Sequence, residues 1–205
     1  MSALPSQSRY IIGTEACERF SFYGMKSILM LYMTGHLLMS DNWATSTLHI
    51  FMGMVYLLPL AGAWLADKVW GRYKTILYIS LLYCVGHGVL ATADLFHTIE
   101  ARRYILMAGL FIIALGAGGI KPCVSAFMGD QIPNKSPKLM TKAFNAFYWA
   151  INLGSFFSFL VIPAMEQRYG YSWAFAVPGL FMGVETHRTT VSYTHLRAHE
   201  TELHL

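Results

Sequence analysis

The stretch that decides the fold reads Glu15-Ala16-Cys17-Glu18-Arg19-Phe20-Ser21-Phe22-Tyr23-Gly24-Met25-Lys26. It places four ionisable side chains within an apolar run that extends from about residue 10 to residue 39. On a helix that turns about 100° per residue, Glu15 and Lys26 lie within about 20° of each other, and Arg19 falls on the same stripe. A charge in the hydrocarbon core of a bilayer costs at least about 2.5–3.5 kcal/mol, so we expect this stripe to face protein or a water-filled cavity. The alternative, that Glu15 and Arg19 reach nearby lipid headgroups, does not account for Lys26, which lies more than about two turns deeper.

The composition predicts a protein that crosses the membrane several times. Of the 205 residues, 55% are hydrophobic and only 13% are charged, whereas soluble domains carry about 25% charged residues. The net charge of +4 is therefore interpreted as loop charge that sets the topology, and no nucleic-acid partner is expected. The three cysteines lie in apolar segments and indicate no disulfide framework, and the sequence predicts neither a metal site nor a cofactor.

Hydropathy predicts an all-α membrane protein with spans at about 10–39, 44–66, 75–93, 104–129 and 143–165, and a sixth span that starts near Ser172. The connections then alternate between the two sides of the membrane. The side of the N-terminus carries seven basic residues and the other side three. The seven are Arg9, Lys68, Arg72, Lys74, Lys135, Lys138 and Lys142, and the three are Arg102, Arg103 and Arg168. The positive-inside rule therefore places the N-terminus in the cytoplasm.

The end of the second span predicts a tight cytoplasmic turn. Gly62, Asp67, Gly71 and Arg72 stand at spacings that allow close approach and ion pairs at a helix end. Within the span, His49, Gly53 and Tyr56 are separated by four and three residues and share one helical face.

A lone lysine marks the fourth span. Lys121 is the one charged residue between Arg103 and Asp130, and a glycine-rich segment precedes it. Such a lysine needs an acidic partner or a lowered pKa, and the carboxylates available inside the spans are Glu15 and Glu18. We therefore expect Lys121 to lie within ion-pairing reach of these two residues.

Two further polar residues allow a packing role as well as a functional one. His87, between two glycines of the third span, is interpreted mainly as a packing residue bonded to a neighbouring helix. Asn152 in the fifth span allows two readings equally, a hydrogen bond between helices or a contact with a ligand.

The sixth span keeps its apolar character only to Gly183. From residue 184 to residue 205 the chain is polar, rich in His and Thr, and without a hydrophobic period. Residues 191–201 resemble translated read-through of a sequencing adapter. We therefore expect residues 1–183 to form the helical bundle, with a truncated sixth helix, and residues 184–205 to be a non-native or disordered tail.

Three motifs resemble the proton-coupled oligopeptide transporters, a branch of the major facilitator superfamily. The first is Glu-x-x-Glu-Arg-Phe-x-Phe-Tyr-Gly in residues 15–24, and the second is Gly-x-x-Leu-Ala-Asp-x-x-x-Gly-Arg in residues 62–72. The third is the aromatic run that ends in Ile-Asn-Leu-Gly at residues 151–154. The resemblance covers residues 10 to about 183 and implies the N-terminal six-helix half of a facilitator fold, built from two inverted three-helix repeats.

The resemblance also implies which residues act. Proton coupling would involve Glu15, Glu18, Arg19, His49 and Lys121, and peptide contacts would come from Tyr23, Lys26, Tyr56 and Asn152. The sequence departs from many relatives at Phe22, where a second tyrosine is common, and at Lys26, where arginine is common. A lysine cannot grip a carboxylate with two parallel hydrogen bonds.

The expected function of the full-length parent is proton-coupled symport of di- and tripeptides into the cell, with the fragment itself inactive. The alternatives are a facilitator of another solute such as nitrate and a non-transporting membrane fragment. An enzyme is not expected, because the spans show no paired Asp and no His-rich cluster. The expected partners are small peptides, protons, the bilayer and a missing C-terminal six-helix half. The expected location is the cell membrane, plasma or inner.

Overall fold

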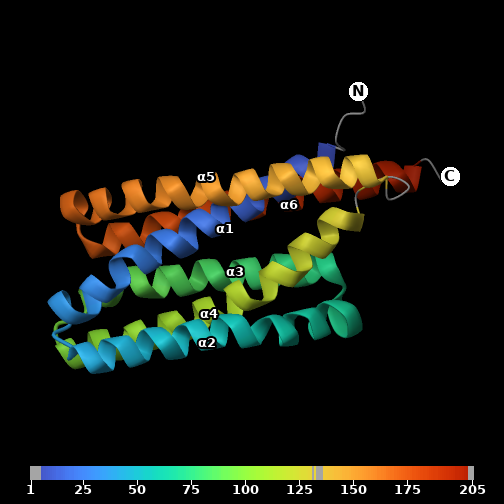
Figure 1. Cartoon of the computed structure of the whole chain (residues 1–205). Coiled ribbons are helices and arrows are strands. Elements are labelled where there is room, and N and C mark those ends of the chain that lie inside the picture. The colour runs from blue at the N-terminus through green and yellow to red at the C-terminus, as the bar shows by residue number, and fades with distance from the viewer. Residues whose placement is uncertain (1–5, 131, 133–135, 203–205) are drawn as a thin grey trace.

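A computed structural model of the chain contains six long helices in its described part (Figure 1). They are α1 (Ser6–Leu31), α2 (Asp41–Leu65), α3 (Arg72–Ala91), α4 (Ile99–Asp130), α5 (Pro137–Tyr169) and α6 (Tyr171–Glu202). Two π-helical turns, η1 (Tyr32–His36) and η2 (Ala66–Trp70), and a 3-10 turn, η3 (Ala93–Leu95), follow the first three. The structure describes the backbone of residues 6–130, 132 and 136–202, and the side chains of these except 6, 7, 9, 72, 119, 121–123, 127, 130, 189 and 191–202.

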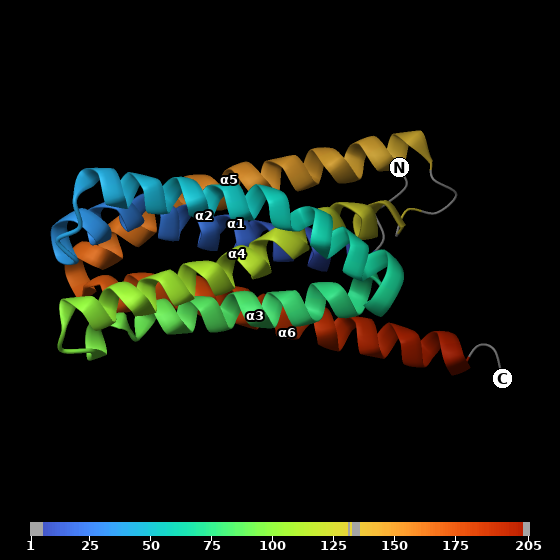
Figure 2. The same cartoon turned by 90° about the horizontal axis from the view of Figure 1, so that it is seen from below.

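The helices form one elongated bundle. Figure 2 shows α2 and α5 along one side, α3 and α6 along the other, and α1 and α4 between them. In agreement, α1 packs on α5 and α6, α3 packs on α4 and α6, and α2 packs on α4. The start of α1 and the end of α6 lie at the same end of the bundle (Figure 1). The predicted all-α architecture, a bundle of six long helices, is found in the described residues.

Four of the helices are apolar and long enough to cross a membrane, judged over the described residues. These segments are Asp41–Trp70, Tyr73–Leu95, Ile99–Gly118 and Pro137–Tyr169. Neither α1, which carries the charges of the opening stretch, nor α6 belongs to this group, although the chain was predicted to cross the membrane in both. The windows in α2 and α5 are only 17% buried, against 44% in α3 and α4. Most of the apolar surface of α2 and α5 therefore faces away from this bundle.

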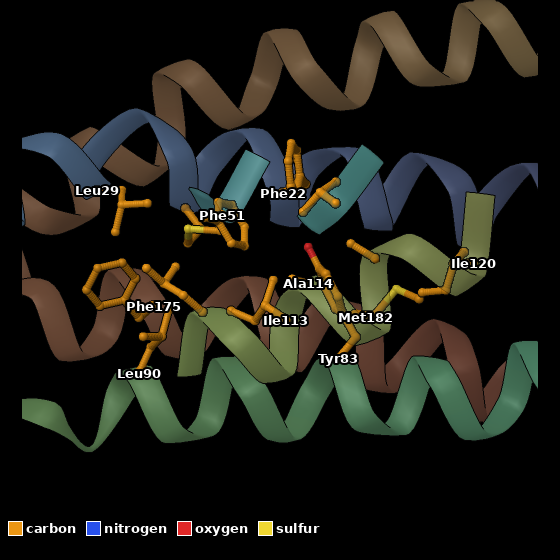
Figure 3. Packing of buried hydrophobic residues seen from close by; sticks show 14 of the residues in the cluster. Phe22, Leu29, Phe51, Tyr83, Leu90, Ile113, Ala114, Ile120, Phe175 and Met182 are labelled. Atoms are coloured by element: carbon orange, nitrogen blue, oxygen red, sulfur yellow. The ribbon is translucent and has the colours of Figure 1, made fainter. Parts of the chain in front are cut away.

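The core lies where α1, α3, α4 and α6 meet. Figure 3 shows Tyr83 of α3 and Phe175 of α6 directed into this space. Phe22 of α1 stacks on Phe51 of α2, and all four residues are almost fully buried. Small residues set the helix spacing. A Cβ atom at Gly154 would lie 2.5 Å from the carbonyl oxygen of Ala16, so only glycine lets α5 approach α1 this closely.

The chain turns tightly between α2 and α3, as predicted, while the cytoplasmic side and the ion pairs expected there stay predictions. Gly71 has φ +76°, a conformation that favours glycine, and its carbonyl accepts a hydrogen bond from Thr75 Oγ1 at 2.8 Å. Gly62 is buried in α2, and Asp67 is exposed within η2. The side chain of Arg72 lies outside the described residues.

The structure differs from the sequence prediction at the end of α6. The helix does not stop near Gly183 but continues to Glu202. Glu185 and Thr186 are buried, with Glu185 Oε1 2.5 Å from the position of a Cβ at Gly13. The small Gly13 leaves room for this side chain, which is how α6 keeps contact with α1 beyond residue 183.

Candidate functional site

The candidate site is a buried charge cluster on α1 formed by Glu15, Glu18 and Arg19. Arg19 Nε lies 2.9 Å from Glu15 Oε1, and Arg19 Nη2 lies 2.5 Å from Glu18 Oε2. The exposed fractions of the three residues are 4%, 0% and 7% in chain order. The predicted stripe therefore faces protein, and the alternative that Glu15 and Arg19 reach the headgroups is wrong for this bundle.

Helix geometry and the neighbouring helices both produce this cluster. The i, i+4 spacing brings Glu15 and Arg19 together on one face, as the sequence predicted. The close approach of α5 at Gly154 to Ala16 covers the same turn. Fully ionised, two carboxylates and one guanidinium sum to −1, which is costly in a dry interior. The cluster is therefore suited to take up one proton or to engage a second cation.

Tyr83 of α3 lies beside this cluster and was not predicted from sequence. Its side chain is completely buried, and its hydroxyl is directed from α3 toward α1 (Figure 3). It is close enough to interact electrostatically with Glu18 and Arg19. The third span has several tyrosines, and no signal in the sequence distinguishes the one that faces α1.

Lys121 lies on α4, but its side chain is outside the described residues, so its expected pairing with Glu15 and Glu18 stays a prediction. The helix register still constrains its position. Ala117, Ile120 and Val124 are buried along one stripe of α4. Position 121 is four residues after the first and three before the last, which is the spacing of neighbours on that stripe.

The predicted peptide-contacting residues come from three helices and retain exposed surface. Tyr23 and Lys26 of α1 are partly buried, Tyr56 of α2 is 69% exposed, and Asn152 of α5 is exposed. Asn152 Nδ2 donates to the Tyr148 carbonyl oxygen of its own helix at 2.8 Å. This hydrogen bond lies within α5 and does not join two helices.

His49 shares an exposed face of α2 with two other predicted residues. His49, Gly53 and Tyr56 are all exposed, as their spacing along one helical face predicts. Together with Asn152 of α5 they lie on the two helices that are least covered by this bundle. The cluster on α1 and the exposed face of α2 are therefore separate groups within the described structure.

His87 of α3 is a packing residue, as predicted. Its side chain is fully buried, and Nδ1 lies 3.2 Å from the Phe175 carbonyl oxygen of α6. Its Cβ lies 2.7 Å from the position of a Cβ at Gly179. No group of three or more metal-ligating side chains occurs among the described residues.

Comparison with known proteins gives consistent results. Human "Solute carrier family 15 member 2" is 41% identical over 88% of this chain and 26% of its own length. "Peptide transporter family 1" of Drosophila melanogaster is 43% identical over 87% of this chain and 25% of its own length. The chain thus spans about a quarter of the length of these curated relatives.

Solved structures match over nearly the whole chain. The POT family transporter PepTSo superposes with a TM-score of 0.85 and 44% identity over 94% of this chain and 38% of its own. An auto-inhibited POT family peptide transporter superposes with a TM-score of 0.83 and 45% identity over 93% and 37%. A sequence model described as the POT family matches residues 73–190. The fold, the buried cluster and these matches together show that the chain is a multi-pass membrane protein of the POT family.

Proposed function

We propose that the full-length protein containing this chain is a symporter that couples proton influx to uptake of di- and tripeptides. The observation that carries the proposal is the buried cluster of Glu15, Glu18 and Arg19, whose formal charge is −1 when all three are ionised. The names of two matched proteins, the Drosophila melanogaster relative and the auto-inhibited transporter, support the substrate class, because both are called peptide transporters. Transport, not enzymatic turnover, is the proposed activity.

A proton on one carboxylate gives the cluster two states. With both glutamates ionised, Arg19 is held by two partners at once. Protonation of one glutamate weakens its attraction to Arg19. The proposed ion pair between Lys121 and that glutamate weakens at the same time. A contact that exists in one conformation only shifts the balance between inward-open and outward-open forms.

Peptide binding is proposed on the exposed side of the bundle. Tyr23, Lys26, Tyr56 and Asn152 would form one wall of the cavity, with Lys26 as a point charge for the peptide carboxylate. His49 is proposed as a second proton site on the same side. The other wall would come from a C-terminal six-helix half. The exposed apolar surfaces of α2 and α5 are suited to pack against that half. The chain alone is expected to be inactive for that reason.

Replacing Lys26 by glutamine in the full-length protein is expected to raise the KM for dialanine about tenfold to hundredfold. The reason is loss of a charged hydrogen bond to the peptide carboxylate, which is worth about 1.5–3 kcal/mol. Concentration-dependent uptake of labelled dialanine measures it. Lys142→Gln, at an exposed cation of α5, is the control and should leave KM unchanged. An unchanged KM in Lys26→Gln would remove this residue from the site.

The same assay separates peptide transport from the alternative of another solute. Unlabelled dialanine and nitrate are offered as competitors of the labelled peptide. The proposal expects competition by dialanine alone. Uptake of nitrate that dialanine does not inhibit would favour the alternative.

We propose the cell membrane as the location, with the N-terminus and residues 67–74 and 131–142 in the cytoplasm. The support is the excess of basic residues on that side. A cysteine placed at exposed Lys138 should react with a membrane-impermeant maleimide only after the cells are opened. Labelling of this position in intact cells would show that the orientation is the opposite of the proposed one. The non-native origin of residues 184–205 is also a proposal, and the open reading frame of the parent beyond Gly183 tests it.

A further inference from the structure

A second polar cluster lies at the opposite end of α1 from the charge cluster. It centres on Asp94 of η3, which contacts side chains of η1 and α6 and lies 4.0 Å from Arg102 Nη1 of α4. Asp94 Oδ1 accepts from the Tyr32 hydroxyl at 3.2 Å and lies 3.0 Å from His36 Nε2. Asp94 Oδ2 accepts from Ser172 Oγ of α6 at 3.2 Å. One carboxylate therefore joins the ends of α1, α3 and α6.

His36 stands between this carboxylate and a cation. Its Nε2 lies 3.0 Å from Asp94 Oδ1 and 3.2 Å from Arg102 Nη1 of α4. One ring nitrogen cannot serve both partners, since it either carries a proton and donates to Asp94 or carries a lone pair and accepts from Arg102. The choice between the two contacts is therefore set by whether Nε2 is protonated.

The other neighbours of His36 do not compete for this role. On α6, the ring of Tyr171 lies 5.1 Å from that of His36. Burial and the nearby Glu166 carboxyl raise the pKa of Tyr171 to about 12, so it stays neutral where histidines titrate. On its own helix, Tyr32 stacks on the imidazole at 5.2 Å. On α4, Arg103 is engaged by Glu100 and by the carbonyl oxygens of residues 37 and 38.

We propose that His36, with Asp94 and Arg102, is a proton-binding site at this end of the bundle. The proton bound at Nε2 gives a hydrogen-bonded ion pair with Asp94 and removes the lone pair to which Arg102 donates, while Arg102 keeps its 4.0 Å contact with Asp94 Oδ1. Loss of the proton lets Nε2 accept from Arg102. The side chain of His36 is 35% exposed, so protons reach it from solution without crossing the core. The proposal does not rest on the proposed transport function. In the proposed orientation, the site faces the outside of the cell.

Double-mutant cycles in the purified chain test this site, with the thermal unfolding midpoint measured at pH 8 and pH 5.5. One cycle combines His36→Gln with Asp94→Asn, and the other combines His36→Gln with Arg102→Gln. The coupling between His36 and Asp94 should become more stabilising at pH 5.5. The coupling between His36 and Arg102 should stabilise at pH 8 and destabilise at pH 5.5. Partly exposed charge pairs of this kind correspond to shifts of about 1–3 °C.

His97→Gln, at an exposed histidine of the same connection, is the matched control and should show no pH-dependent coupling with Asp94→Asn. A second readout is independent of stability. Nitrogen-15 spectra of the histidine-labelled chain report directly whether His36 Nε2 carries a proton, and this signal should differ between pH 8 and pH 5.5. Couplings that are equal at both pH values, or an Nε2 signal that does not respond, would reduce the cluster to a fixed structural tie and overturn the proposal.

Discussion

Replacing Arg19 by leucine is expected to destabilise the chain by about 3–5 kcal/mol, because the change leaves two carboxylates in the bundle core without the cation between them. Glu15 and Glu18 keep only 4% and 0% of their surface, so water cannot replace the guanidinium. For a chain of this length the loss corresponds to a fall of the unfolding midpoint of about 10 °C. Thermal unfolding of the purified chain in detergent measures it.

Two further variants show whether charge, and not the size of the side chain, causes the loss. Arg168→Leu removes an exposed cation that contacts the Tyr169 ring at 5.7 Å, and it should cost no more than about 1 kcal/mol. Adding Glu15→Gln and Glu18→Gln to Arg19→Leu neutralises the two carboxylates that have lost Arg19. The unfolding midpoint should then regain much of the decrease caused by Arg19→Leu. A triple variant as unstable as Arg19→Leu alone would show that packing, not charge, explains the effect.

Replacing Lys121 by alanine is expected to abolish dialanine uptake driven by a proton gradient in the full-length protein. The buried stripe of Ala117, Ile120 and Val124 favours a position for Lys121 against the interior. In the proposed pair, its ammonium would be a second cation beside Glu15 and Glu18. Without the proposed pair, protonation of a glutamate would release no contact between α1 and α4, so a proton gradient could not drive the conformational change.

Exchange across the membrane is the matching control. Counterflow of labelled against unlabelled dialanine needs a binding cavity but no net proton movement, so Lys121→Ala should retain it. Normal gradient-driven uptake in this variant would contradict the role of Lys121. An ammonium nitrogen more than about 10 Å from both carboxylates in an experimental structure would contradict the pairing, since an ion pair requires far closer contact.

The features that the sequence predicted correctly are those that one helix determines by itself. The i, i+4 pair of Glu15 and Arg19 follows from the helical repeat, and so does the shared face of His49 and Tyr56. The turn at Gly71 is equally local, because its positive φ depends on the residue type. The six-helix fold followed from hydropathy together with the motifs.

The features that the sequence did not predict depend on how helices dock. Tyr83 lies beside the charge cluster because of the face that α3 turns toward α1. Asp94 and His36 are 58 residues apart and meet because η3 ends beside η1. The contact of α6 with α1 past Gly183 uses the space left by Gly13 on α1. No hydrophobic period or motif in the sequence indicates these contacts, because each is set by side-chain packing between segments far apart in the sequence.

The most direct test of a proton-coupling role for the α1 cluster counts protons. Full-length protein in liposomes is given dialanine outside, and proton influx is recorded with a trapped pH dye alongside dialanine influx. The unchanged protein should acidify the interior in step with peptide entry. Glu18→Gln should still exchange dialanine across the membrane, but without acidification and without accumulation against a gradient. Glu18→Gln that brings in protons with dialanine at the unchanged ratio would contradict the account.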